Sequence, residues 1–164
     1  MTFETLIFVD GENLFIRYQE MIKAGRKPAP DNIIIDGYFV WNNRTLDDEL
    51  WRIKRLSYYT SVIGADEKVV SVRKEIAAVT FECTTDQDAS GKFSYTGQII
   101  PFVRKKSSKS KKESICDIAI AVDVMRACYR DHADAIWIFS GDGDFIQLFQ
   151  EVVHSGKRAY AAAL

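Results

Sequence analysis

Residues Ala135 to Phe145 have the sequence AIWIFSGDGDF, in which a run of five apolar residues leads directly into a turn that carries two carboxylates. The run is short and rich in isoleucine and aromatic residues, which predicts a buried strand. Asp142 and Asp144 then lie just beyond its carboxyl end. Ligands bind at that edge of an open α/β sheet, and carboxylate oxygens suit a hard cation such as Mg²⁺ or Mn²⁺. The alternative is an acid–glycine turn in which Asp144 caps the next helix.

The start of the chain has a similar pattern. Residues 5–9 (TLIFV) form a compact run that ends at Asp10 and Gly11, which predicts a first buried strand followed by a turn. Apolar residues recur at helical spacing over residues 13–24, and Gly25 is a natural stop for a helix there. Asp10 is therefore expected at the same edge of the sheet as the acids that follow residue 139.

Asn13 lies three residues beyond Asp10, one turn into the expected helix. Its carboxamide either points back to orient a water or a phosphate oxygen, or caps the helix. Glu12 lies between the two and is expected to point elsewhere, although it is an additional candidate ligand.

Asp117 is a third candidate, in the first turn of a helix expected over residues 114–128. Residues 118–122 are apolar on every face, so this helix is expected to be buried, and an ionised carboxylate on it needs a partner. A favourable interaction with the helix dipole is the alternative. Asp123 is rotated by about 120° from Asp117, so it either supports the same site from a different face or pairs with Arg126.

Apolar runs alternate with amphipathic helical patterns through the chain, which favours a doubly wound α/β architecture. We predict a three-layer α/β/α sandwich with a mainly parallel central sheet, in a single domain that spans residues 1–164. Residues 26–46 are expected to be an insertion, residues 46–51 a short helix, and residues 84–98 a polar loop or a hairpin. The expected strands are 5–9, 56–63, 80–83, 99–103, 135–139 and 157–161, and the expected helices are 13–24, 65–78, 114–128 and one that begins at Asp142.

Composition excludes several classes of protein. The 164 residues are 47% apolar and 27% charged, which is typical of one globular domain with a core. No apolar run reaches 18 residues and no basic flank of a signal peptide is present at the start, so we expect a cytoplasmic protein without a membrane partner. The three cysteines include no C-x-x-C pair, which argues against a disulfide framework or a zinc site.

The net charge of −1 conceals a strongly basic segment over residues 104–112, which we interpret as a loop. Such a run is usually a solvated loop, but beside a carboxylate cluster it would hold a polyphosphate backbone that the acids alone repel. The candidate residues for this phosphate contact are Arg104, Lys105, Lys106, Lys109, Lys111 and Lys112.

Three blocks of this sequence resemble those of NYN domains, a family that includes the LabA-like proteins and belongs to the PIN-like nuclease superfamily. They are DGEN at residues 10–13, DIAIAVD at residues 117–123 and SGDGDF at residues 140–145. The resemblance runs in order from residue 5 to about residue 160. One departure concerns the Lys-Gly-Val that precedes the helix aspartate in many relatives, since here Ser114, Ile115 and Cys116 stand there.

This resemblance implies a PIN-like α/β/α fold and metal-dependent cleavage of RNA. By position, the metal-binding and catalytic acids would be Asp10, Asp117, Asp142 and Asp144, with Asn13 also catalytic and with Ser140 and Asp123 in support. The implied cofactor is Mg²⁺ or Mn²⁺.

The leading hypothesis is therefore a ribonuclease that hydrolyses phosphodiester bonds of single-stranded RNA with a metal-activated water. The expected partner is single-stranded or structured RNA, and a homodimer is left open. An RNA-binding or assembly module of the same fold, with little turnover, is the alternative. A haloacid-dehalogenase-type phosphatase is disfavoured because it needs D-x-D after its first strand, where this chain has Asp10-Gly11-Glu12.

Overall fold

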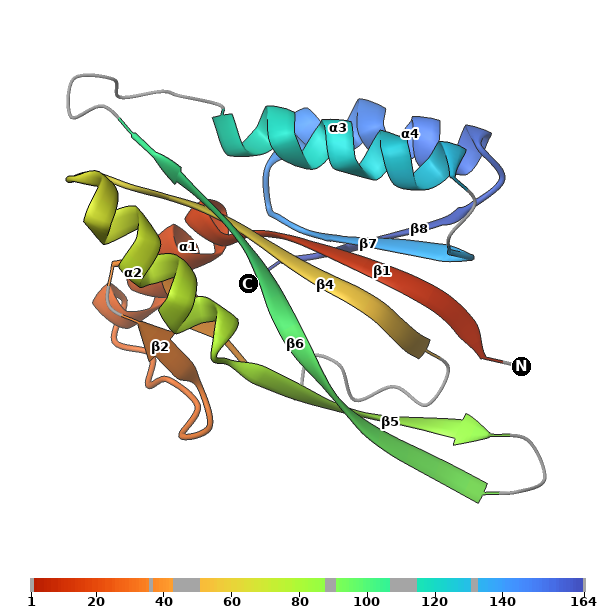
Figure 1. The fold of residues 1–164 in the computed structure, drawn as a ribbon, viewed down its shortest axis with the longest axis horizontal. Coiled ribbons are helices and arrows are strands. Elements are labelled where there is room, and N and C mark those ends of the chain that lie inside the picture. Colours follow the sequence, from red (N-terminus) through yellow and green to blue (C-terminus); the bar gives the residue numbers. More distant parts are fainter. Residues whose placement is uncertain are drawn as a thin grey trace.

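The computed structural model describes residues 2–35, 37–42, 51–87, 91–106, 115–130 and 133–163. These residues form a six-stranded sheet in the order β5-β6-β4-β1-β7-β8 and a separate two-stranded sheet, β2-β3 (Figure 1). The elements are β1 (Phe3–Asp10), α1 (Gly11–Lys23), β2 (Ile33–Ile35), β3 (Phe39–Trp41), β4 (Trp51–Val62), α2 (Asp66–Ala77), β5 (Thr80–Gln87), β6 (Gly91–Lys105), α3 (Ile115–Tyr129), β7 (Ala135–Phe139), the 3₁₀ turn η3 (Gly143–Phe145), α4 (Ile146–His154) and β8 (Arg158–Ala162).

The sheet is mainly parallel, as predicted. β1 pairs in parallel with β4 and β7, β4 with β6, and β7 with β8, whereas β5 is antiparallel to β6. Parallel strands need helices on both faces, and Figure 1 shows α3 and α4 on one face of the sheet and α1, α2 and the β2–β3 hairpin on the other. The fold is therefore the expected three-layer α/β/α sandwich, and the carboxyl ends of its parallel strands share one edge.

Alternation along β4 divides the core between the two faces of the sheet. Tyr58 packs in the cluster that includes Phe15 of α1 and Ile76 of α2, whereas its neighbour Tyr59 packs in the cluster that includes Ile120 of α3. Successive residues of a strand point to opposite faces, so one strand anchors both helical layers. β4 therefore stabilises the edge on which the predicted site lies.

The prediction that residues 114–128 form a buried helix was correct for the helix but wrong for its burial. The buried residues of α3 are Cys116, Ile120, Val124, Ala127 and Cys128, which form one stripe. Ile118 is 65% exposed and Val122 is 42% exposed. The helix lies on one face of the sheet, so only one stripe of its surface reaches the core.

Other boundaries also differ from the prediction. β4 begins at Trp51, five residues before the predicted strand, and most of the short helix expected over residues 46–51 lies outside the described residues. Of the two alternatives predicted for residues 84–98, the structure shows the hairpin, since the described residues there belong to the antiparallel pair β5–β6. Within residues 26–46, the described part contains the β2–β3 hairpin.

The basic segment 104–112 is only partly described, and its first residues are not a loop. Arg104 and Lys105 are the last residues of β6, and Lys106 follows directly. Lys109, Lys111 and Lys112 lie outside the described residues. β6 therefore carries the start of the basic segment to the carboxyl edge of the sheet. In the described residues, no helix combines the length and the apolar character needed to cross a membrane.

Candidate functional site

Asp10 lies at the carboxyl end of β1 and is the N-cap of α1. Its Oδ1 accepts a hydrogen bond from the backbone N–H of Asn13 at 3.1 Å, and its Oδ2 accepts one from the Ser140 hydroxyl at 2.8 Å. The residue is 3% exposed. A single buried carboxylate therefore caps the first helix and joins the ends of β1 and β7, and the cap falls on Asp10 rather than on Asn13.

Asn13 and Ser140 complete a network between α1 and the loop after β7. The Asn13 side-chain Oδ1 accepts a hydrogen bond from the backbone N–H of Gly141 at 2.9 Å. The Ser140 Oγ accepts one from the backbone N–H of Asp142 at 3.1 Å. The loop that carries the predicted acids is thus held against the start of α1 by side chains predicted to support the site.

Gly11 permits the close approach of α1 to β4 that this network requires. A methyl group at Gly11 would lie 2.7 Å from the carbonyl oxygen of Tyr59 and would overlap the ring of Tyr58. Only glycine fits there, because protein interiors are closely packed and leave no empty space for the additional methyl group. The glycine after Asp10 therefore determines where the first turn of α1 lies.

Burial raises the pKa of Asp10 to about 6, from an ordinary value of 3.8. The hydrogen bonds from Asn13 and Ser140 oppose this shift, whereas the negative charges of Asp117 and Glu12 add to it. Burial is also the main reason that the pKa of the Cys116 thiol is raised to about 12. The negative charges of Glu12, Asp10 and Asp117 add to that shift. Three carboxylates thus create a local negative field that a cation would relieve.

The sequence predicted that Glu12 points away from the site, but the structure places its carboxylate at the same edge. Its carboxylate accepts a hydrogen bond from the Ser61 hydroxyl, and its Oε2 lies 3.4 Å from the Nζ of Lys106. Ser61 is near the carboxyl end of β4 and Lys106 follows β6, so both reach this edge through strand pairing. Sequence reasoning did not single out Ser61, because a serine in a strand carries no local signal.

Asp142 and Asp144 lie on the exposed turn after β7. The Oδ1 of Asp142 accepts a hydrogen bond from the backbone N–H of Asp144 at 3.0 Å, so Asp142, not Asp144, caps the turn that leads into α4. Among the described residues, no three His, Cys, Asp or Glu side chains are close enough together to hold a metal ion. The structure therefore brings Asp10, Asn13 and Ser140 into contact, while the four predicted ligands do not form a closed cage.

The donor chemistry nevertheless fits a hard divalent cation. The side chains that gather around Asp10 offer carboxylate, carboxamide and hydroxyl oxygens. These are the ligands that Mg²⁺ and Mn²⁺ prefer. The pKa of Asp10 is raised mainly by burial and then by the charges of Asp117 and Glu12, and a bound cation would favour the charged carboxylate against all three.

Asp123 belongs to a different part of the α3 surface. It accepts a hydrogen bond from the Tyr59 hydroxyl at 2.9 Å, and its Oδ1 lies 3.1 Å from the Nη1 of Arg126. Six helical residues also separate it from Asp117 by about 9 Å along the axis. The structure thus shows the pairing with Arg126 that the sequence analysis considered as the alternative.

Ser140→Ala is expected to raise the pKa of Asp10 further, because the Ser140 hydroxyl stabilises the charged carboxylate. The measurement is an NMR titration of the Asp10 carboxyl carbon in metal-free protein. Ser155→Ala is the matched control, since that hydroxyl donates to the Val152 carbonyl at the far end of α4. An unchanged or lower Asp10 pKa in Ser140→Ala would contradict the assignment.

A mainly parallel sheet whose central strand ends in a buried carboxylate, with further acids on the neighbouring helices, defines an α/β/α domain of the PIN-like type. The chain belongs to the NYN domain family, whose model matches residues 4–163. This family has a PIN-like nuclease fold, and its members are generally nucleases. The resemblance noted in the sequence is therefore confirmed over nearly the whole chain.

Comparison with solved structures supports the same fold. A protein of unknown function from Vibrio parahaemolyticus RIMD 2210633 is similar, with a TM-score of 0.58 and 15% sequence identity. The alignment covers 99% of this chain and 82% of that one. At this identity the similarity concerns the fold alone. None of the curated proteins matches this chain at a significant level.

Proposed function

We propose that the protein is a metal-dependent ribonuclease that hydrolyses phosphodiester bonds of single-stranded RNA at the carboxyl edge of its sheet. The observation that carries the proposal is the buried carboxylate of Asp10, whose pKa is raised to about 6 by burial and by the nearby charges of Asp117 and Glu12. Strongly perturbed acids of this kind concentrate at functional sites.

The cation would be held by Asp10 and Asp117, with Asp142 and Asp144 as the remaining proposed ligands. When bound, Mg²⁺ or Mn²⁺ supplies Lewis acidity and lowers the pKa of a coordinated water. The Ser140 hydroxyl and the Asn13 N–H orient the two oxygens of Asp10. Asn13, through its bond to Gly141, holds the loop of Asp142 beside them.

The start of the basic segment lies where an RNA strand would need it. Lys106 contacts Glu12 at the edge, and Lys105 forms a 2.7 Å ion pair with the exposed Asp66. Lys106 thus lies beside a carboxylate of the site, and the basic segment that it belongs to would compensate the repulsion between the acids and a phosphate backbone. The full set proposed to contact RNA is Arg104, Lys105, Lys106, Lys109, Lys111 and Lys112.

An RNA-binding or assembly module with little turnover is the second candidate. It is favoured by the exposure of Asp142 and Asp144 and by the lack of a three-ligand cluster among the residues that the structure describes. The cytoplasmic location and the homodimer stay predictions from the sequence.

Asp142→Asn is expected to reduce cleavage of labelled single-stranded RNA in Mn²⁺ by at least about a hundredfold. Mutation of a residue that only orients a metal ligand costs up to about a hundredfold in activity, and removal of the ligand itself should cost more. EDTA should abolish cleavage by the wild-type protein. Glu151→Gln, which removes an exposed carboxylate from α4, is the control and should cleave normally. Equal loss of RNA in wild type, EDTA and Asp142→Asn would contradict the nuclease and favour the binding module.

A further inference from the structure

A concave surface lies between α3 and the middle of the sheet, away from the carboxyl edge. It is a pocket of about 490 Å³. Four of its lining residues are cationic and one is acidic. They are Leu6, Lys54, Arg55, Asp123, Arg126, Ala127 and Arg130, and we call this the basic pocket.

An irregularity in strand pairing creates the basic pocket. Ile53 of β4 pairs with Thr5 of β1 and Arg55 pairs with Leu6, so Lys54 is skipped in the register. Consecutive residues of a regular strand point to opposite faces, yet Lys54 and Arg55 both line this pocket. A bulge is a known means of re-aiming a side chain, and here it places two adjacent cations on one side.

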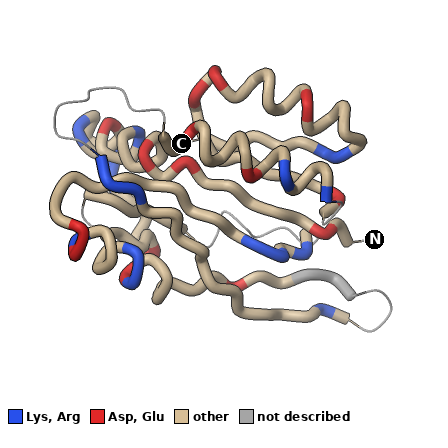
Figure 2. The backbone as a smooth tube through the Cα atoms, turned by 45° about the horizontal axis from the view of Figure 1, so that its top comes forward, with Lys and Arg blue, Asp and Glu red and all other residues tan. Residues whose placement is uncertain are grey.

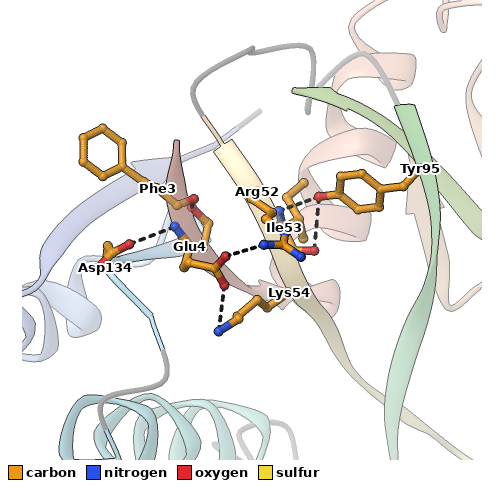
Figure 3. Close-up of polar contacts among 8 residues, drawn as sticks. Phe3, Glu4, Arg52, Ile53, Lys54, Tyr95 and Asp134 are labelled. Carbon is orange, nitrogen blue, oxygen red and sulfur yellow. Dashed lines mark hydrogen bonds and ion pairs between the residues drawn. The ribbon is translucent and has the colours of Figure 1, made fainter. Parts of the chain in front are cut away.

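The charge of the pocket is only partly balanced by the carboxylates around it. Glu4 lies between Arg52 and Lys54, at 3.0 and 2.7 Å from their side-chain nitrogens (Figure 3). Asp123 is shared between Arg126 and the Tyr59 hydroxyl. Figure 2 shows basic positions both on β4 and in the last part of α3. The pocket therefore keeps an excess of positive charge.

Arg55 gives the pocket its chemical specificity. Its guanidinium lies over the Phe8 ring, 5.4 Å from the ring centroid. Its Nε is buried and has no hydrogen-bond partner among the described residues. A buried donor without an acceptor is costly, and a guanidinium fork matches the oxygens of a phosphate in a bidentate manner. An oxyanion is therefore the kind of ligand that the guanidinium of Arg55 favours in this pocket.

We propose that the basic pocket binds backbone phosphates of the RNA strand, as a second contact apart from the cleavage site. Leu6 lies four strand residues before Asp10, about 13 Å away, so one phosphate cannot occupy both places. A strand that continues from the carboxyl edge along α3 would reach it. The identity of the ligand as RNA rests on the proposed function, whereas the preference for phosphate rests on the pocket itself.

The test measures binding without cleavage, by fluorescence anisotropy of labelled oligouridylate in EDTA. Arg55→Gln is expected to weaken binding roughly tenfold and to reduce the slope of log affinity against log salt by about one. Arg130→Gln, directly after α3, should act in the same direction and is the second variant if Arg55→Gln fails to fold. Arg26→Gln removes the same charge from an exposed position after α1 and should bind as wild type.

Three results would overturn the inference. The first is unchanged RNA affinity in Arg55→Gln and Arg130→Gln. The second is an equal loss in Arg26→Gln, which would show an effect of net charge alone. The third is a loss of inorganic tripolyphosphate binding in Arg55→Gln while its RNA affinity stays at the wild-type value. RNA binding that depends on Arg55 in a protein that cleaves no RNA would support the basic pocket and reject the nuclease. RNA cleavage together with RNA binding that does not depend on Arg55 would support the nuclease and reject the basic pocket.

Discussion

Asp10→Asn is expected to abolish metal-dependent cleavage of RNA and, at the same time, to stabilise the metal-free protein above pH 6. The substitution keeps the shape of the side chain and an oxygen that can accept the Asn13 N–H or the Ser140 hydroxyl. It removes the negative charge that a cation needs, so cleavage in Mn²⁺ should fall by about a thousandfold.

The gain in stability follows from the direction of the pKa shift. Burial and neighbouring acids raise the pKa of Asp10 from 3.8 to about 6 in the folded protein. Between these values the folded state binds more protons than the unfolded state, so the free energy of unfolding decreases as pH rises from about 4 to 6. The charged carboxylate then costs up to about 3 kcal/mol at neutral pH, and asparagine avoids this cost.

Urea unfolding across pH 4 to 8 in EDTA measures this difference. The wild-type protein should lose stability over that window relative to Asp10→Asn, and Mn²⁺ should restore it only in the wild type, because ligand binding favours the folded state. Asp66→Asn is the control for stability, since that side chain is 83% exposed and its ion pair should contribute little. A variant that cleaves RNA at the wild-type rate would refute the role of Asp10.

Gly11→Ala is expected to destabilise the protein by about 3 kcal/mol or more, or to prevent folding, because its methyl group would overlap the buried ring of Tyr58. Relief would require α1 to move away from β4 or Tyr58 to turn. Tyr58 also accepts a hydrogen bond from the backbone N–H of Val40, so its movement would disturb β3 as well. The measurement is the midpoint of thermal unfolding.

Gly143→Ala is the matched control for this substitution. A methyl group there would meet only the Cδ1 of Ile146, at 4.0 Å, which is ordinary van der Waals contact. Both glycines follow an aspartate of the predicted site, so a general requirement for glycine in such turns would affect both variants equally. A stability of Gly11→Ala close to that of Gly143→Ala would show that α1 can move without cost.

The local pattern of the sequence was sufficient for the elements that carry the site. The apolar runs before Asp10 and Ser140 became β1 and β7, adjacent parallel strands whose ends meet. Capping was assigned less well, since both Asn13 and Asp144 were considered as caps and the structure uses Asp10 and Asp142. Several polar residues stand within a few positions of each helix start, and the path of the backbone selects among them.

The face of a helix that is buried could not be inferred from α3 alone. Its middle is apolar all round, and only the position of the sheet determines that Ile120 is buried and Ile118 is exposed. Asp123 was ambiguous for the same reason. Its contact with Tyr59 joins residues that are 64 positions apart, and no local spacing encodes such a contact.

By itself the sequence determined the class of fold, the family and the strand ends at which Asp10 and the acids after β7 lie, because hydrophobic periodicity and parallel pairing are local or topological properties. The tertiary structure alone decided that Glu12 meets Ser61 and Lys106, and that Lys54 and Arg55 share a pocket with α3. These contacts depend on which strands pair and in what register. A shift of one residue in a strand turns every side chain to the other face, and only packing of the whole domain selects the register.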